Sequence, residues 1–153
     1  MNTIDILISI RQIMRSVNQE SKRIEKDHGV SIPQILCLNY LKRSPNFQST
    51  QNELRLFLNL NGSSMHGLIE RLEKKGLIAR LPKSGDRRKV QISLTAKGDK
   101  LTGTIPPTLL DRLAKNLVLQ DEQTLTGLQS YLQLLTKLME INVSTTDPTP
   151  AET

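Results

Sequence analysis

The fold of this chain is decided by residues 50–81, which read TQNELRLFLNLNGSSMHGLIERLEKKGLIARL. A short helix is predicted to begin at Thr50, because Thr50 and Glu53 have the spacing of a capping box. A second helix is predicted over residues 63–75, and Gly76 ends it. Its apolar residues recur at helical spacing on one face: Met65, Leu68, Ile69 and Leu72. Two short helices joined by a tight turn that contains glycine are typical of a helix-turn-helix.

A β-hairpin is predicted directly after the helix pair. Residues 77–81 have the composition of a strand, and residues 89–94 alternate strictly, with Val90, Ile92 and Leu94 on one face. The turn between them, residues 82–88, is basic. A helix pair followed by a hairpin with a positively charged tip indicates a mainly α winged helix-turn-helix with a small β-hairpin wing, at about residues 31–98.

Helices are also predicted on both sides of this segment. Residues 3–27 form a long amphipathic helix that His28 and Gly29 end, and Ser31 and Gln34 form a capping box for a helix that stops near Ser44. Thr95 caps a further helix, which the prolines at 106–107 must bend or break. The last helix begins near Asp121 and has a leucine-rich face. Residues 142–153 are polar and contain proline, which predicts a disordered tail.

The apolar surface of the terminal segments exceeds what one core of this size can cover. Isoleucines widen the apolar face near the start of residues 3–27, beyond the stripe that faces a core. We therefore expect a single domain over residues 1–141 that forms a homodimer through residues 3–27 and 105–141.

The net charge of +6 is concentrated in one fifth of the chain. Residues 70–100 hold ten lysines and arginines against four acidic residues, whereas the rest of the chain is neutral. A charge excess confined in this way is the expected electrostatic footprint of a protein that binds a polyanion. A solvated surface that happens to be basic would have the same composition.

Several classes of function are disfavoured. The single cysteine, Cys37, lies between leucines on a predicted helix and is interpreted as a small buried apolar residue. His28 is interpreted as a residue at a helix end, where the helix dipole favours a cation. We found no metal-ligand spacing, no nucleophile–base pair and no apolar run long enough for a membrane span, so we expect a cytoplasmic protein that is not an enzyme and has no cofactor.

Three segments together resemble the MarR (multiple antibiotic resistance regulator) family. They are Leu72-Glu73-Lys74-Lys75-Gly76-Leu77-Ile78, then Asp86-Arg87-Arg88, then Leu94-Thr95-Ala96-Lys97-Gly98. Their order and spacing match the family's L-E-x-x-G-L-I, wing D-x-R and L-T-x-x-G segments. The resemblance is specific over about residues 50–98. It implies a winged helix-turn-helix dimer that regulates transcription. The expected role is that of a repressor, which a small-molecule effector releases from an inverted-repeat operator in double-stranded DNA.

The resemblance also suggests which residues bind DNA. On the recognition helix they are Ser63, Ser64, His66 and Arg71, and on the wing they are Lys83, Arg87, Arg88 and Lys89. Asp86 is expected to stabilise the wing turn. His66 and Gly67 stand where threonine and arginine are common in the family, and Gly67 costs about 1 kcal/mol of helix propensity relative to alanine.

A small aromatic or apolar acid is the expected effector, because ligands in this family commonly bind where the dimerisation helices meet the winged domain. Here that position corresponds to Ile13, Val17, Leu36 and Tyr40, together with the helix that follows Thr95. The alternative function is a winged-helix module that binds another protein without sequence-specific DNA binding. The salt dependence of duplex binding separates the two, because only polyanion binding releases condensed counterions.

Overall fold

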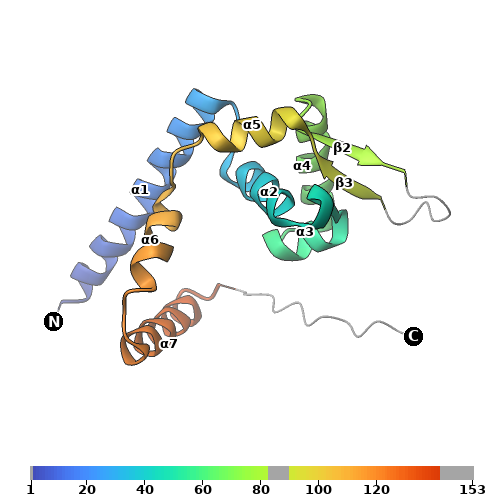
Figure 1. The fold of residues 1–153 in the computed structure, drawn as a ribbon. Helices are drawn as coiled ribbons and strands as arrows, with labels where there is room; N and C mark the ends of the chain where they lie inside the picture. The colour runs from blue at the N-terminus through green and yellow to red at the C-terminus, as the bar shows by residue number, and fades with distance from the viewer. Residues whose placement is uncertain (1, 83–89, 142–153) are drawn as a thin grey trace, which may run out of the picture. The chain divides into compact units, whose positions relative to one another are not determined.

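The computed structural model describes residues 2–82 and 90–141 (Figure 1). Helices predominate and a small three-stranded sheet accompanies them, so the predicted fold class is confirmed. The elements in chain order are α1 (Thr3–His28), α2 (Ile32–Arg43), a 3-10 turn (Pro45–Phe47), β1 (Gln48–Thr50), α3 (Gln51–Leu58), α4 (Gly62–Lys74), β2 (Ile78–Leu81), β3 (Gln91–Leu94), α5 (Ala96–Thr104), α6 (Leu109–Leu117) and α7 (Glu122–Leu138).

The chain divides into two compact units, one up to Thr108 and one from Leu109 onward. The first unit contains α1 to α5 and the sheet, and the second contains α6 and α7. The prolines at 106–107 lie in the break between α5 and α6, as expected. The segment predicted as one dimerisation region, residues 105–141, therefore holds two helices, and α6 had no separate prediction.

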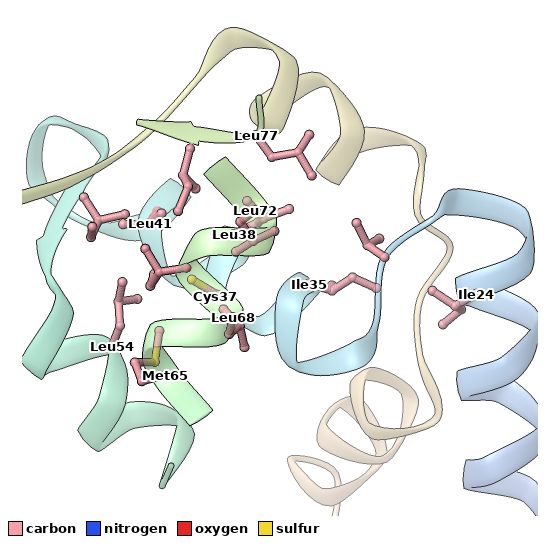
Figure 2. Close-up of a cluster of buried hydrophobic side chains, with 14 residues drawn as sticks. Ile24, Ile35, Cys37, Leu38, Leu41, Leu54, Met65, Leu68, Leu72 and Leu77 are labelled. Atoms are coloured by element: carbon pink, nitrogen blue, oxygen red, sulfur yellow. The ribbon is translucent and has the colours of Figure 1, made fainter. Parts of the chain in front are cut away.

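The hydrophobic core lies in the first unit, between α2, α3, α4 and the sheet (Figure 2). Its fully enclosed side chains come from all of these elements: Cys37, Leu38, Leu41, Leu54, Met65, Ile69, Leu72 and Ile92. The four apolar residues predicted for the buried face of the second short helix are all buried. Ile24 is the one buried residue of α1, so nearly the whole length of that helix lies outside this core.

Both predicted capping boxes are formed. Ser31 accepts a hydrogen bond from the N–H of Gln34, whose side chain accepts from the N–H of Ser31 in return. Thr50 and Glu53 make the same pair of bonds at the start of α3. Gly29 ends α1 in the left-handed conformation, with φ of 72°, which a glycine adopts without strain.

The sheet has the order β1-β3-β2, with both pairs antiparallel. The predicted hairpin is present and pairs Ile78 with Leu94 and Arg80 with Ile92. The first strand was missed by the sequence reasoning. It is three residues long and pairs with β3, more than forty residues later in the chain, at Ser49 and Ile92. This added strand fixes the start of α3 to the base of the wing.

Candidate nucleic-acid interface

The recognition helix begins one residue earlier than predicted, at Gly62. Asn61 is its N-cap, and the Asn61 side chain accepts a hydrogen bond of 2.8 Å from the N–H of Ser64. The N–H of Met65 makes the first main-chain bond of the helix, to the carbonyl of Asn61. The N–H groups of Gly62 and Ser63 thus lie outside the helix's own bonding pattern and point beyond its N-terminus.

The predicted contact residues near this terminus share one exposed surface. Ser63, Ser64 and His66 are all exposed, while Met65 between them is fully buried and holds the helix on the core. Because Asn61 caps the helix, neither serine hydroxyl is needed for that role. The first turn of α4 therefore presents two small hydroxyl side chains and free main-chain donors, an arrangement suited to a phosphate group.

Arg71 lies back along the helix toward Gly67. A Cβ atom built at Gly67 would be 3.6 Å from the Nη2 atom of Arg71. Because Gly67 has no side chain, the guanidinium group of Arg71 borders open space at that position. Arg71 and Ser64 also line a hollow of about 420 Å³ together with Ser31 and Gln34 of the α2 N-terminus. The structure therefore brings two of the predicted contact residues, Ser64 and Arg71, to one hollow.

An ion pair joins α4 to the base of the wing. The Nε atom of Arg80 on β2 is 3.2 Å from a carboxylate oxygen of Glu73 on α4, although the angle there does not meet hydrogen-bond geometry. The pair is partly exposed, so its contribution to stability is small. The ion pair instead orients the two elements, because it links β2, the strand that leads into the wing, to the recognition helix α4.

The predicted wing residues Lys83, Asp86, Arg87, Arg88 and Lys89 lie outside the described residues. Their roles remain predictions from the sequence. The strands on either side of these residues are described, and Leu81 at the end of β2 pairs with Gln91 at the start of β3.

Two lysines of the basic residues 70–100, Lys75 and Lys97, lie away from the N-terminus of α4, and sequence reasoning did not predict their contacts. Lys75 donates hydrogen bonds to the carbonyl of Gly29 and to the side chain of Gln34. Lys97 donates a 2.8 Å bond to the carbonyl of Lys75. Both ammonium groups lie near the C-terminal end of α4, at the opposite end from Ser63 and His66. The partners are distant in sequence, so no local pattern signals these contacts.

The four residues expected to bind an effector lie on two helices. Ile13 and Val17 are exposed on α1, and Leu36 is exposed on α2. Tyr40 is half-buried on α2, and its ring packs against that of Phe57 on α3, with the ring centroids 4.6 Å apart. The effector site at these four residues stays a prediction.

Cys37 is fully enclosed in the core, and burial raises the pKa of its thiol to about 12. The thiol is therefore protonated and unreactive at neutral pH, as the sequence interpretation holds. Within residues 2–82 and 90–141, no group of three or more histidine, cysteine or acidic residues is arranged to hold a metal ion. No helix in the same ranges is long and apolar enough to cross a membrane.

An exposed recognition helix capped by Asn61, together with the β2–β3 hairpin, defines a winged helix-turn-helix protein. Residues 28–89 match the family model described as "MarR family". The segment that contains the winged helix-turn-helix therefore matches the MarR family, as the sequence resemblance suggested.

Known proteins agree with this assignment. The chain is 30% identical over 95 residues to the HTH-type transcriptional repressor MdtR of Bacillus subtilis (strain 168), a match that covers 62% of this chain and 60% of that protein. It thus spans about three fifths of the length of this curated relative. The S. aureus MepR–DNA complex superposes with a TM-score of 0.66 at 24% identity and covers 85% of this chain and 95% of that one. NadR in complex with 4-hydroxyphenylacetate gives a TM-score of 0.57 at 26% identity, with 86% and 92% covered.

Proposed function

We propose that this protein is a DNA-binding transcriptional regulator of the cytoplasm rather than an enzyme. In the proposal it acts as a homodimer on an inverted-repeat operator, and each subunit inserts α4 into a major groove. Arg88 of the wing enters the adjacent minor groove, and Arg87 and Lys89 contact phosphates beside it. The observation that carries this proposal is the first turn of α4. Its free N–H groups and exposed Ser63, Ser64 and His66 face outward, while Met65 anchors the same turn in the core.

Charge supports the same conclusion. Residues 70–100 alone account for the net charge of the chain, and they include the last residues of the recognition helix and the whole wing. A DNA duplex is a polyanion that these two elements can contact together. The relatives support it as well, because MdtR is named a transcriptional repressor and the MepR structure is a complex with DNA. We propose repression as the sign of regulation on the strength of these names.

A small-molecule effector completes the proposal. NadR binds 4-hydroxyphenylacetate, an aromatic acid, and the expected effector of this chain is of the same chemical class. The proposed site comprises Ile13, Val17, Leu36 and Tyr40. An acid bound there would change the separation of the two recognition helices and lower operator affinity, and operator would weaken effector binding by the same factor.

The test is a titration of a mixed-sequence duplex at several salt concentrations. The parent protein is expected to lose affinity steeply as salt rises, and Lys89→Ala is expected to make the slope shallower by ~1. Arg88→Ala should weaken binding by about 1–3 kcal/mol, most where the minor groove is A·T-rich and narrow. Lys137→Ala on α7 is the control for loss of one positive charge and should leave the slope unchanged. Binding that does not respond to salt would favour the protein-interaction alternative.

His66 separates specific from non-specific contacts. Replacing His66 with alanine should relax the preference at one or two base pairs of each half-site and leave affinity for a scrambled duplex nearly unchanged. A uniform loss on operator and scrambled duplex would show instead that His66 contacts the phosphate backbone.

A further inference from the structure

Asn61 and Gly62 form the one asparagine–glycine pair of the sequence. The side-chain amide of an asparagine can be attacked by the main-chain nitrogen of the next residue, and glycine obstructs that attack least because it has no side chain. Both residues are exposed, and a Cβ atom built at Gly62 would meet no atom within 4 Å. Solvent therefore reaches both groups. The pair has no part in the function predicted from the sequence beyond its place before the recognition helix.

The capping bond of α4 activates the side-chain amide of Asn61. Its Oδ1 atom accepts a 2.8 Å hydrogen bond from the N–H of Ser64. A donor at this oxygen draws electron density from Cγ and stabilises the negative charge that the oxygen acquires when a nucleophile adds. The same bond folds the side chain back over the first turn, at the end where Gly62 begins the helix.

The main-chain nitrogen of Gly62 is available as the nucleophile. Its N–H donates no hydrogen bond to any residue that the structure describes. The partial positive charge at a helix N-terminus favours loss of its proton, because that charge stabilises the anionic nitrogen. Attack requires rotation about the Asn61 Cα–C bond, which opens the bond from the N–H of Met65 to the Asn61 carbonyl. This bond lies at a helix end, where local opening costs little free energy.

We propose that Asn61 is a deamidation site and that the carboxylate formed there weakens the binding of α4 to DNA. After a hydroxide ion removes its proton, the Gly62 nitrogen bonds to Cγ of Asn61. The Cγ–Nδ2 bond then breaks, and the amide nitrogen leaves as ammonia after taking a proton from water. Water adds to either carbonyl of the resulting succinimide ring, which gives aspartate or isoaspartate. The net reaction consumes water and releases ammonia, and nothing is oxidised or reduced.

The effect on DNA binding rests on the proposed function. Both products carry a negative charge next to Ser63 and Ser64, which are proposed to contact phosphate, so the charge repels the duplex. The stability of the fold responds differently. Aspartate caps a helix as well as asparagine does, and its charge is favourable at a helix N-terminus. Loss of duplex binding without loss of stability therefore distinguishes the effect of the charge from unfolding of α4.

Peptide mapping by mass spectrometry tests the chemical step on the full chain during incubation at increasing pH. Asn61 should deamidate at least about tenfold faster than Asn59, an exposed asparagine that leucine follows, which is ~1.4 kcal/mol in activation free energy. The rate should rise with pH, because a base removes the proton of Gly62. Equal rates at Asn59 and Asn61 would overturn the proposal.

Gly62→Ala tests the nucleophile. The variant keeps Asn61 and its capping bond, and the added methyl group meets open space, so the fold should persist. Crowding of the attacking nitrogen should slow deamidation at least about tenfold. Gly103→Ala makes the same exchange in open space on α5 and should deamidate at the parent's rate. A Gly62→Ala protein that reacts as fast as Gly103→Ala would refute attack by the Gly62 nitrogen.

Asn61→Asp and Asn61→Ser isolate the charge, because serine also caps a helix but stays neutral. Asn61→Asp should bind duplex at least about threefold more weakly than Asn61→Ser, the size expected for one exposed charge contact. Its thermal unfolding midpoint should equal or exceed that of Asn61→Ser. Equal duplex affinity of the two variants, or a clearly lower midpoint for Asn61→Asp, would overturn the proposed consequence.

Duplex titrations before and after incubation separate this proposal from the proposed function. The parent should lose affinity in proportion to the deamidated fraction, whereas Gly62→Ala should keep the affinity it had before incubation. Duplex binding by fresh protein without deamidation at Asn61 refutes the modification site alone. Deamidation at Asn61 in a protein that does not bind duplex when fresh supports the chemical step and refutes DNA recognition together with the consequence.

Discussion

The segment from α2 to α5 and the helices that flank it are built from similar apolar residues, but they use them differently. In the segment from α2 to α5, leucines and isoleucines from three helices and the sheet are fully enclosed in one cluster. In α1 only Ile24 is buried, and α6 and α7 contain no buried residue. Large apolar side chains such as Leu7, Ile13 and Leu132 are instead half exposed or more.

This difference separates residues that stabilise the subunit from residues that are available for assembly. Exposed apolar surface of this extent on a soluble protein marks an interaction site. Because it recurs on α1 and on α7, the segments predicted to form the dimer, we propose that a second copy of the chain covers it. A two-fold arrangement would then set the spacing between two copies of α4.

The largest expected effect comes from the enclosed region. Leu38→Ala removes a side chain that is 0% exposed and should lower the free energy of unfolding by about 2–5 kcal/mol. Urea unfolding followed by circular dichroism measures it. Leu132→Ala on α7, where the side chain is half exposed, is the matched control and should cost far less in the isolated subunit. If both variants lose the same free energy of unfolding at protein concentrations below the dimer dissociation constant, the distinction between the two regions is wrong.

A charge placed on the exposed apolar face of α1 should weaken the proposed dimer. Leu7→Asp on α1 places a carboxylate in the proposed dimer interface and should raise the dimer dissociation constant about thirtyfold or more, as for an interface residue worth 2 kcal/mol. The subunit should keep its helical content, because Leu7 lies outside the core. Sedimentation velocity over a concentration series measures the change.

Leu56→Asp is the control for this charge. Leu56 is also an exposed apolar residue, but it lies on α3, in the DNA-binding segment. If it dissociates the dimer as strongly as Leu7→Asp, the interface does not lie on α1.

Two glycines of α5 test how tightly the enclosed region is packed. Gly98→Ala places a methyl group against the carbonyl of Leu77 and should destabilise the protein by about 1–3 kcal/mol. Gly103→Ala meets open space and should be neutral or stabilise by up to about 1 kcal/mol, because alanine favours the helix. Thermal unfolding of both variants gives the comparison. If Gly98→Ala stabilises as much as Gly103→Ala, α5 is not fixed against Leu77.

The smallest effect concerns the cap of α7. Asp121 accepts a hydrogen bond from the N–H of Thr124, and this bond lowers the pKa of the Asp121 carboxyl below its ordinary value of 3.8. The ionised group therefore contributes stability that is fully present above pH 3.8 and is lost as pH falls through the lowered pKa. Asp121→Asn keeps an acceptor but removes the charge. Its difference in stability from the parent should shrink as pH falls below 3.8, which unfolding at a series of pH values measures. A constant difference would show that the charge has no role.

Local signals in the sequence predicted the parts of the fold that local bonds create. The capping boxes at Ser31 and Thr50 and the buried face that contains Met65 are set by residues three or four apart, and all are present. The strand Gln48–Thr50 was missed because its stability comes from pairing with β3, far along the chain. The sequence analysis began α4 at Ser63 and did not use Asn61, which caps the helix, so the first residue of α4 was placed one position too late.

The candidate site shows the same division. Ser63, Ser64 and His66 fall outside the apolar stripe of α4 and are exposed, as helical periodicity predicts, whereas their contact with DNA stays a prediction. The contacts of Lys75 and Lys97 depend on the packing of α1, α4 and α5 against one another, which charge counts do not reveal. The sequence therefore assigned no individual role to Lys75 or Lys97, although both contribute to the charge of residues 70–100.

Selection of bound duplexes from a random pool tests the central claim most directly. If two subunits joined through their flanking helices each present α4, the enriched sequences should form an inverted repeat with half-site centres about one helical turn, ~10 bp, apart. Enrichment should depend on His66 at specific base pairs and on Lys89 only through overall affinity. A pool that shows no enrichment, or enriched sites without two-fold symmetry, would contradict the account.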